Sequence, residues 1–160
     1  MNDNPSIDDV FNVLDVDNIW GTLWQGACPP GGNVLKDNGF DVLVLAAADH
    51  QVSSMYHGIQ VICAPGDDDP RLHRFEKFLP TWIAAAHEVA DLVRAGKKVL
   101  VTCMAGLNRS GFIVALAVHY LTGWPGSKCL AYVRSQRQMS LCNGTFARYI
   151  HDNLKSTDQS

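Results

Sequence analysis

Five residues separate Cys103 from Arg109, and the pair lies between an apolar segment at 98–102 and a second apolar segment that begins near Arg109. The first segment is typical of a β-strand and the second of a helix. A thiol that a strand delivers to the N-terminus of a helix meets backbone N–H groups and the positive end of the helix dipole. Such a setting lowers the pKa of a thiol, binds an anion of the size of phosphate and favours attack on it by the thiolate.

Other residues of the same segment suit this chemistry. The Arg109 guanidinium is a planar fork of donors that matches two phosphoryl oxygens. Gly106 and Gly111 stand where a tight backbone or a close helix start needs no side chain. Ser110 follows the arginine, so its hydroxyl can donate to the thiolate, although a plain helix-start role is an equally open interpretation. The alternative for Cys103 is a buried structural thiol, which the strand-to-helix context disfavours.

The run Cys103-x-x-Gly106-x-x-Arg109-Ser110 resembles the signature loop of cysteine-dependent protein tyrosine phosphatases, and the small size of the chain indicates the dual-specificity branch. The resemblance implies hydrolysis through a phospho-cysteine intermediate, with Cys103 as nucleophile and Arg109 and Ser110 as further catalytic residues. It also implies that phosphate is bound by consecutive residues of the loop: Met104, Ala105, Gly106, Leu107, Asn108 and Arg109. The chain departs from the family at Thr102, because the family usually has histidine directly before the nucleophile.

The similarity extends more loosely over residues 18–154. Trp20–Gly26 is similar to the opening strands of the family, and Asn143-x-x-Phe146 is similar to its C-terminal segment. The resemblance implies an α/β fold: a single domain with a mixed, mostly parallel sheet of four to five strands and helices on both faces. We therefore expect a catalytic domain at 18–154, a partly flexible N-terminal segment at 1–17 and a flexible tail at 155–160. We expect no cofactor and no metal, because Arg109 and the backbone amides supply the electrostatic stabilisation.

An acidic segment lies about 35 residues before the cysteine, at Pro65–Pro70. A thiol nucleophile needs a general acid to protonate the leaving oxygen and then a base to activate water. Family members carry this acid on a loop at the same place. Counting from the end of the preceding strand favours Asp68, counting back from 78–80 favours Asp69, and Asp67 stays open. We predict Asp68; the alternative is a solvated acidic turn, because Gly, Asp and Pro are the usual turn residues.

The leading hypothesis is a phosphatase of phosphotyrosine, with or without activity on phosphoserine and phosphothreonine. Asn108, directly before the arginine, is also similar to the loop of RNA 5′-triphosphatases. Phosphoinositide phosphatases are a further alternative, although their loops tend to carry lysines where this chain has Met104 and Leu107. A phosphate-binding pseudophosphatase is disfavoured by the intact Cys103 and Arg109. The expected partner is a phosphorylated protein or another phosphomonoester.

Composition narrows the remaining classes. The chain has 160 residues, 47% of them hydrophobic and 18% charged, which is ordinary for one globular domain. The net charge of −3 argues against a broadly basic surface for nucleic acid. The longest wholly apolar runs have seven residues, too few to cross a bilayer. Five cysteines without Cys-x-x-Cys spacing indicate neither a zinc site nor a disulfide scaffold, so we expect the reducing cytoplasm.

Periodicity predicts the order of the elements. Strands are expected on both sides of a turn in 18–26, and at 41–47, 59–63 and 98–102. A helical pattern over 72–93 contains Pro80, which we expect to divide it into a short piece and a main helix. Three further helices are expected: one from near Arg109 to Gly123, one from a cap at Ser127 to about Arg137, and one from a cap at Asn143 to Leu154.

Two groups of residues receive weaker assignments. Three arginines form a basic rim for anionic substrates in one interpretation, but solvated helix faces are the more common case: Arg134, Arg137 and Arg148. Four cysteines are expected to be packing residues, with reaction of one of them with an oxidised Cys103 as a less favoured alternative: Cys28, Cys63, Cys129 and Cys142.

Overall fold

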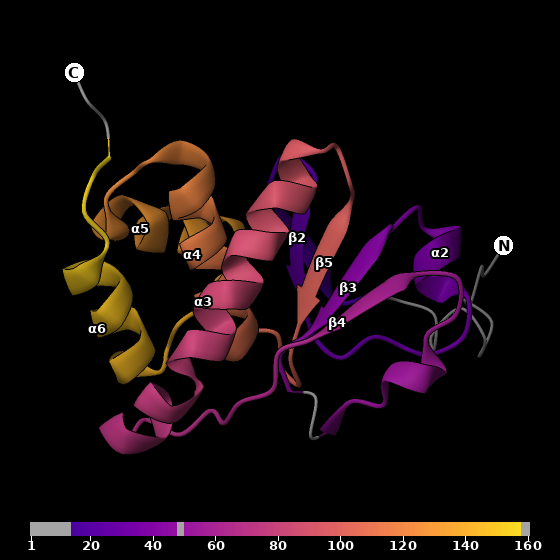
Figure 1. The fold of residues 1–160 in the computed structure, drawn as a ribbon, viewed down its shortest axis with the longest axis horizontal. Coiled ribbons are helices and arrows are strands. Elements are labelled where there is room, and N and C mark those ends of the chain that lie inside the picture. The colour runs from indigo at the N-terminus through magenta and orange to yellow at the C-terminus, as the bar shows by residue number, and fades with distance from the viewer. Residues whose placement is uncertain (1–13, 48–49, 158–160) are drawn as a thin grey trace, which may run out of the picture.

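The computed structural model describes residues 14–47 and 50–157, which form a five-stranded sheet with helices packed against it (Figure 1). The strands are β1 (Val16–Trp20), β2 (Leu23–Gly26), β3 (Val42–Leu45), β4 (Gln60–Cys63) and β5 (Val99–Thr102). Their order across the sheet is β1-β2-β5-β3-β4, antiparallel between β1 and β2 and parallel elsewhere. The predicted mixed, mostly parallel sheet is confirmed, and β5 lies at its centre.

Strands β3 and β5 are buried along their whole length. Successive side chains of a strand point to opposite faces, so each strand supplies two cores. Valines point to the main core and leucines to a smaller core on the other face: Val42, Val44, Val99 and Val101 against Leu43, Leu45 and Leu100. The unbroken apolar content of these strands is therefore the pattern of parallel strands that are covered on both sides.

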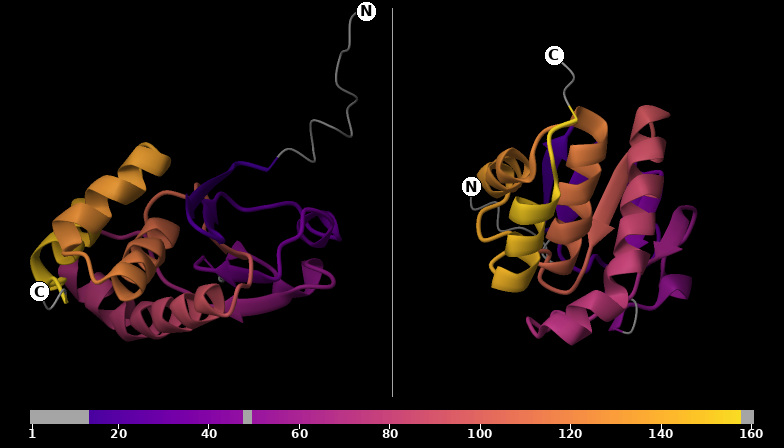
Figure 2. Two further views of the ribbon diagram at one scale, coloured as in Figure 1. Left: turned by 90° about the horizontal axis from the view of Figure 1, so that it is seen from above. Right: turned by 60° about the vertical axis from the view of Figure 1, so that its left-hand side comes forward.

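The helices cover the two faces unequally. The main core contains side chains from α3 (Leu72–Arg94), α4 (Arg109–Thr122), α5 (Gly126–Gln136) and α6 (Gly144–Asn153). On the other face the described residues contribute the single turn α2 (Val34–Asp37), with Leu35 in the smaller core, and the short 3₁₀ turn η2 (Ser53–Met55). Figures 1 and 2 show α4, α5 and α6 on the side of the sheet away from α2. Helices on both faces are thus confirmed.

Helix α3 runs without interruption from Leu72 to Arg94, so the predicted division at Pro80 is wrong. Proline inside a helix removes one backbone hydrogen bond and costs about 3 kcal/mol. Phe75 and Trp82 lie on either side of Pro80, are buried, and have ring centroids 6.1 Å apart. Both rings also contact Phe112 of α4. Packing of this shared apolar face stabilises the helix more than the proline destabilises it.

Helix α4 is buried from Ser110 to His119, so it is a central helix that is covered on all sides. Its last residue, Thr122, is followed by the C-cap Gly123, whose φ of 73° is in the left-handed region that glycine adopts freely. The bounds of α4 agree with the prediction, which places its N-terminus directly after the loop of Cys103.

The start of α5 differs from the prediction. The helix begins at Gly126 after Pro125, so Ser127 lies within the first turn and does not cap it. A Cβ on Gly126 would lie 1.7 Å from the carbonyl oxygen of Ile150 in α6, which means that α5 starts in direct backbone contact with α6. Tertiary packing therefore sets this boundary. By contrast, the predicted cap of α6 is confirmed: Asn143 Oδ1 accepts a hydrogen bond from Thr145 N at 3.1 Å.

Most of the N-terminal segment predicted at 1–17, and the end of the tail predicted at 155–160, lie outside the described residues. Within them, β1 begins at Val16, and the N–H of Thr157 donates to the carbonyl of Gly123 at 2.9 Å. Across 14–47 and 50–157, no helix has the length and apolar character that crossing a bilayer requires.

Candidate active site

Residues 103–109, here called the cysteine loop, connect the central strand β5 to the N-terminus of α4. Cys103 directly follows β5 and is 3% exposed. Its Sγ lies 3.3 Å from the Oγ of Ser110, which is buried in the first turn of α4. The loop therefore brings the predicted thiol and hydroxyl within hydrogen-bond distance at the carboxyl end of the sheet.

The carbonyl groups of residues 104–107 all accept hydrogen bonds from groups behind the loop. Two donors are backbone N–H groups: Cys28 N donates to Met104 at 3.1 Å, and Leu141 N donates to Leu107 at 3.0 Å. The Arg137 guanidinium donates to Ala105 through Nη2 at 3.2 Å and to Gly106 through Nε at 2.8 Å. Gly106 also accepts from Gln25 Nε2 at 2.9 Å. By contrast, none of the N–H groups of 104–109 donates to another described residue. The carbonyl groups of the loop are therefore hydrogen-bonded, whereas its N–H groups have no described acceptor. A loop of this kind is suited to bind an anion.

Gly106 makes this backbone path possible. Its φ is 73°, a left-handed conformation that costs residues with a Cβ roughly 1–2 kcal/mol. A Cβ at this position would also lie 2.3 Å from the carbonyl carbon of Gly26 and 2.5 Å from Ala27 N. The cysteine loop can therefore pack against the end of β2 only with glycine at 106.

Thr102, the residue before the predicted nucleophile, belongs to a buried hydrogen-bond network. Its Oγ1 donates to the carbonyl of Val44 and accepts from Gln51 Nε2, both at 3.0 Å. Gln51 Oε1 in turn accepts from the N–H of Ala47 at 3.1 Å. The hydroxyl thus connects β5 to β3 and to Gln51, after β3.

Arg109, the last residue of the cysteine loop, lines a hollow of about 530 Å³ together with His50, residues 67–69 and Pro70. One arm of its guanidinium is held, because Nη1 donates to the carbonyl of Gly66 at 3.0 Å. Its Nε is buried and has no hydrogen-bond partner among the described residues. The remaining donors are therefore available to an anion in the hollow.

Two of the three candidate carboxylates in this hollow are ion-paired with arginines. Asp67 pairs with Arg74 of α3. Asp69 pairs with Arg71, whose Nη2 is 2.6 Å from Oδ2 and whose backbone N–H also donates to Oδ1 at 2.9 Å. The bonds from the Arg71 side chain, followed by that from its N–H, hold the pKa of the Asp69 carboxyl at about 2.

Asp68 has no cationic partner among the described residues. Its Oδ2 accepts from Asn108 Nδ2 at 2.9 Å, and its Oδ1 accepts from Asn143 Nδ2 at 3.0 Å. The structure therefore connects Asp68 directly to the cysteine loop through Asn108, and it distinguishes three carboxylates that are adjacent in the sequence.

This geometry agrees with the comparison to known families. The family described as "dual specificity phosphatase, catalytic domain" matches the chain over residues 23–153. The chain belongs to this family. No curated protein matches the chain.

Solved structures support the fold of this dual specificity phosphatase. A mouse putative dual specificity phosphatase in complex with zinc tungstate is 20% identical, with a TM-score of 0.68 and coverage of 89% of both chains. Human DUSP28 is 21% identical with a TM-score of 0.65, covering 88% of this chain and 95% of its own. The tyrosine phosphatase OH1 of Orf virus is 22% identical with a TM-score of 0.66, covering 89% and 87%.

Sequence reasoning missed three residues that support the site of this phosphatase: Gln25, Gln51 and Arg137. Arg137 was expected at a basic rim or on a solvated face, and both interpretations are wrong, because it is 6% exposed and binds the cysteine loop. Gln25 is fully buried, and a glutamine within an otherwise apolar strand is the signal that could have identified it.

The remaining arginines and cysteines differ in burial and in hydrogen bonding. Arg134 donates to the carbonyls of Ser140 and Leu141 at 3.1 and 2.9 Å, so it supports the segment behind the loop. Arg148 is exposed. The prediction of packing cysteines holds for buried Cys129 and is wrong for the three exposed ones: Cys28, Cys63 and Cys142.

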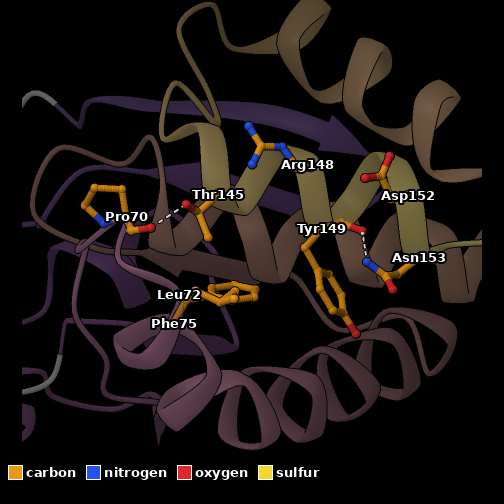
Figure 3. Close-up of a pocket in the computed structure, with 8 residues that line it drawn as sticks. All are labelled: Pro70, Leu72, Phe75, Thr145, Arg148, Tyr149, Asp152 and Asn153. Carbon is orange, nitrogen blue, oxygen red and sulfur yellow. Dashed lines mark hydrogen bonds between the residues drawn. The ribbon is translucent and has the colours of Figure 1, made fainter.

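A second hollow, of about 360 Å³, lies between the start of α3 and helix α6 (Figure 3). Phe75 and Tyr149 supply aromatic surface, and Arg148 lies at the α6 side. Pro70 lines both this hollow and the hollow of Arg109, and its carbonyl accepts a hydrogen bond from Thr145 Oγ1.

Proposed function

We propose that this phosphatase hydrolyses phosphotyrosine monoesters through a phospho-cysteine intermediate, with Cys103 as the nucleophile. The observation that carries the proposal is the cysteine loop, whose carbonyls bind donors behind it and whose N–H groups have no described partner. A phosphoryl group bound to these N–H groups would lie between Cys103 and Arg109, the first and last residues of the loop. Preorganised N–H donors of this kind stabilise the charge that develops in the transition state.

In the first step the Cys103 thiolate attacks phosphorus. An S–P bond forms, the bond from phosphorus to the tyrosine oxygen breaks, and Asp68 transfers its proton to that oxygen. Asp68 is favoured over its neighbours because each neighbour pairs with an arginine, which stabilises the ionised carboxylate. An acid must instead carry its proton when the substrate binds.

In the second step water attacks the phospho-cysteine. Asp68, now ionised, accepts a proton from the water; an O–P bond forms and the S–P bond breaks. The electron pair of that bond returns to Cys103, and the Ser110 hydroxyl, 3.3 Å from Sγ, donates a hydrogen bond to the leaving thiolate. Inorganic phosphate is released, and the enzyme returns to its starting protonation state.

Charge around the hollow supports a phosphotyrosine substrate. The three carboxylates at 67–69 line the same hollow as Arg109, and residues 104–108 contain no lysine. A substrate with several phosphates, such as a phosphoinositide or a 5′-triphosphate RNA, would meet Arg109 as the single cation of the cysteine loop, because Arg71 and Arg74 are already paired with Asp69 and Asp67. A phenyl ring is neutral, and Met104, which is 45% exposed on the loop, offers it a polarisable apolar surface.

The first test is hydrolysis of p-nitrophenyl phosphate by the wild type and by Cys103→Ser. Cys63→Ser is the matched control, because Cys63 is exposed at the end of β4. We expect Cys103→Ser to lose activity and Cys63→Ser to retain it. Rapid acid quenching with ³²P-labelled substrate should trap label on the wild type and not on Cys103→Ser. An active Cys103→Ser variant would refute the mechanism.

The second test compares substrates at equal concentration: a phosphotyrosine peptide, a phosphoserine peptide, a phosphoinositide and a 5′-triphosphate RNA. We expect the highest kcat/KM for the phosphotyrosine peptide. A higher value for the lipid or the RNA would assign the enzyme to that substrate class, and the proposed specificity would be wrong while the role of Cys103 still stood.

A further inference from the structure

The side-chain amide of Asn108 has a fixed orientation in the cysteine loop. Its Oδ1 accepts a hydrogen bond from the backbone N–H of Asn143 at 2.8 Å. A backbone N–H can only donate and only the oxygen of a side-chain amide accepts, so this bond assigns the oxygen and nitrogen ends of the group. The NH₂ end must therefore point the other way, where Nδ2 donates to Asp68 Oδ2 at 2.9 Å.

The amide of Asn143 is fixed in the same manner from the other side. Its Oδ1 caps α6 by accepting from the N–H of Thr145 at 3.1 Å. Its NH₂ end is left to Asp68, and Nδ2 donates to Oδ1 at 3.0 Å. Both oxygens of one carboxyl group thus accept from amides whose orientations are set by backbone donors.

The backbone on both sides of Asp68 is also tied to these elements. Arg109 Nη1 donates to the carbonyl of Gly66, two residues before Asp68. Thr145 Oγ1 donates to the carbonyl of Pro70, two residues after it (Figure 3). The segment that carries Asp68 is therefore joined to the cysteine loop and to the first turn of α6.

We propose that Asn108 and Asn143 are positioning residues that hold the Asp68 carboxyl in the hollow that Arg109 also lines. This inference rests on the proposed function, in which Asp68 is the general acid. The two amides do not block that role, because each carboxyl oxygen has two lone-pair sites and only one of them is used by its amide. A proton on the other site can face the leaving oxygen while the amide bond is kept.

The proposal predicts a dependence on the leaving group. A phenolate such as that of tyrosine is a strong base and needs protonation as it departs. p-Nitrophenolate is a much weaker base and departs with little assistance. A variant that displaces Asp68 should therefore lose more activity on phosphotyrosine than on p-nitrophenyl phosphate, whereas a general loss of folded enzyme lowers both rates equally.

Asn143→Ser is the sharpest variant, because serine keeps the cap of α6 but is too short to donate to Asp68. We expect the ratio of kcat on phosphotyrosine to kcat on p-nitrophenyl phosphate to fall at least about tenfold, part of the 10²–10⁴-fold that general acids contribute. Asn108→Ser removes the other donor and should lower the ratio in the same direction. Asn153→Ala, at the other end of α6, is the matched control and should leave the ratio unchanged.

The double variant Asn143→Ser/Asp68→Asn separates positioning from mere structure. Asp68→Asn alone should lower the ratio further than Asn143→Ser does. Adding Asn143→Ser to it should then have no further effect on the ratio, because the residue acts only through Asp68. Additive losses, or an unchanged ratio in Asn143→Ser, would overturn the positioning role while leaving Asp68 as the acid. An unchanged ratio in Asp68→Asn would overturn both assignments, and the role of Cys103 would still be tested by trapping.

Discussion

Replacing Arg137 with methionine should loosen the cysteine loop. The buried guanidinium donates to the carbonyls of Ala105 and Gly106 at 3.2 and 2.8 Å. Its Nη1 also donates to Asp15 and Asp17 at 3.0 and 2.9 Å, which connects the loop to β1 and to the residue before it. Methionine is similar in length and apolar, so the substitution removes these bonds without opening a large cavity.

The expected loss in free energy of unfolding depends on which hydrogen-bond partners of Arg137 stay buried without another donor. A hydrogen bond from a charged donor contributes about 1.5–3 kcal/mol, and two such bonds to loop carbonyls are lost. Gly106 keeps its bond from Gln25, so the larger cost falls on Ala105. Asp15 and Asp17 are 70% and 46% exposed and return to water, where each pair contributes at most about 1 kcal/mol. Relief of the cost of burying the Arg137 charge offsets part of the loss. We expect the free energy of unfolding to fall by about 2–4 kcal/mol.

Urea denaturation measures that free energy of unfolding. The value of kcat/KM on p-nitrophenyl phosphate reports whether the cysteine loop keeps its geometry. We expect kcat/KM to fall by more than about tenfold, because small displacements of catalytic donors are costly. Arg148→Met is the control, since Arg148 is exposed on α6, and it should change neither quantity appreciably. If Arg137→Met unfolds within about 0.5 kcal/mol of the wild type and keeps its kcat/KM, the bonds to the carbonyls do not hold the loop.

Three further outcomes are expected. Gly106→Ala should abolish activity and lower the free energy of unfolding by several kcal/mol, because its Cβ would lie 2.3 Å from the Gly26 carbonyl carbon; wild-type kcat in a folded variant would contradict this. Burial raises the pKa of the Cys129 thiol from 9.0 to about 11, so the folded state holds that proton longer than the unfolded state. Stability on the order of 2 kcal/mol should therefore be lost as pH rises from 9 to 11, and Cys129→Ala should lack that slope in unfolding measurements. The Asp69 carboxyl, held at a pKa of about 2 by Arg71, should stay ionised well below 3.8 and lose its stabilising pairing only as pH falls through about 2; a ¹³C NMR midpoint at 3.8 would exclude the pairing in solution.

Local pattern was sufficient for most of the fold. Apolar runs identified β3, β4 and β5, and spacing of three and four identified α4 and α6 with their ends. The errors at Pro80 and Ser127 share one cause. Each residue has a strong local preference, and in each case contacts with another helix determine the boundary: the aromatic packing of α3 on α4, and the backbone contact of α5 with α6.

The buried residues that hydrogen-bond to the cysteine loop could not be predicted from local sequence patterns. Gln25 contacts Gly106 from 81 residues away, and Arg137 does so from 31 residues away. Neither spacing has a periodic signature, since the contacts exist only after β2 and β5 have paired and α5 has packed beside β1. Buried polar residues of this kind are visible in a sequence only as an exception, such as a glutamine in an apolar strand.

The three adjacent aspartates are equivalent in the sequence, but the side chains that bind them in the structure differ. An ion pair and a general acid make opposite demands on a carboxyl group, because the pair stabilises the anion and the acid must begin protonated. Asp67 and Asp69 meet the first demand through arginines at and after the start of α3, and so hold their segment against that helix. Asp68, between them, is bound by neutral amides that fix its position without adding a positive charge. Under the proposed mechanism, a segment with one carboxylate could satisfy only one of these demands, whereas three allow the outer two to anchor the central acid.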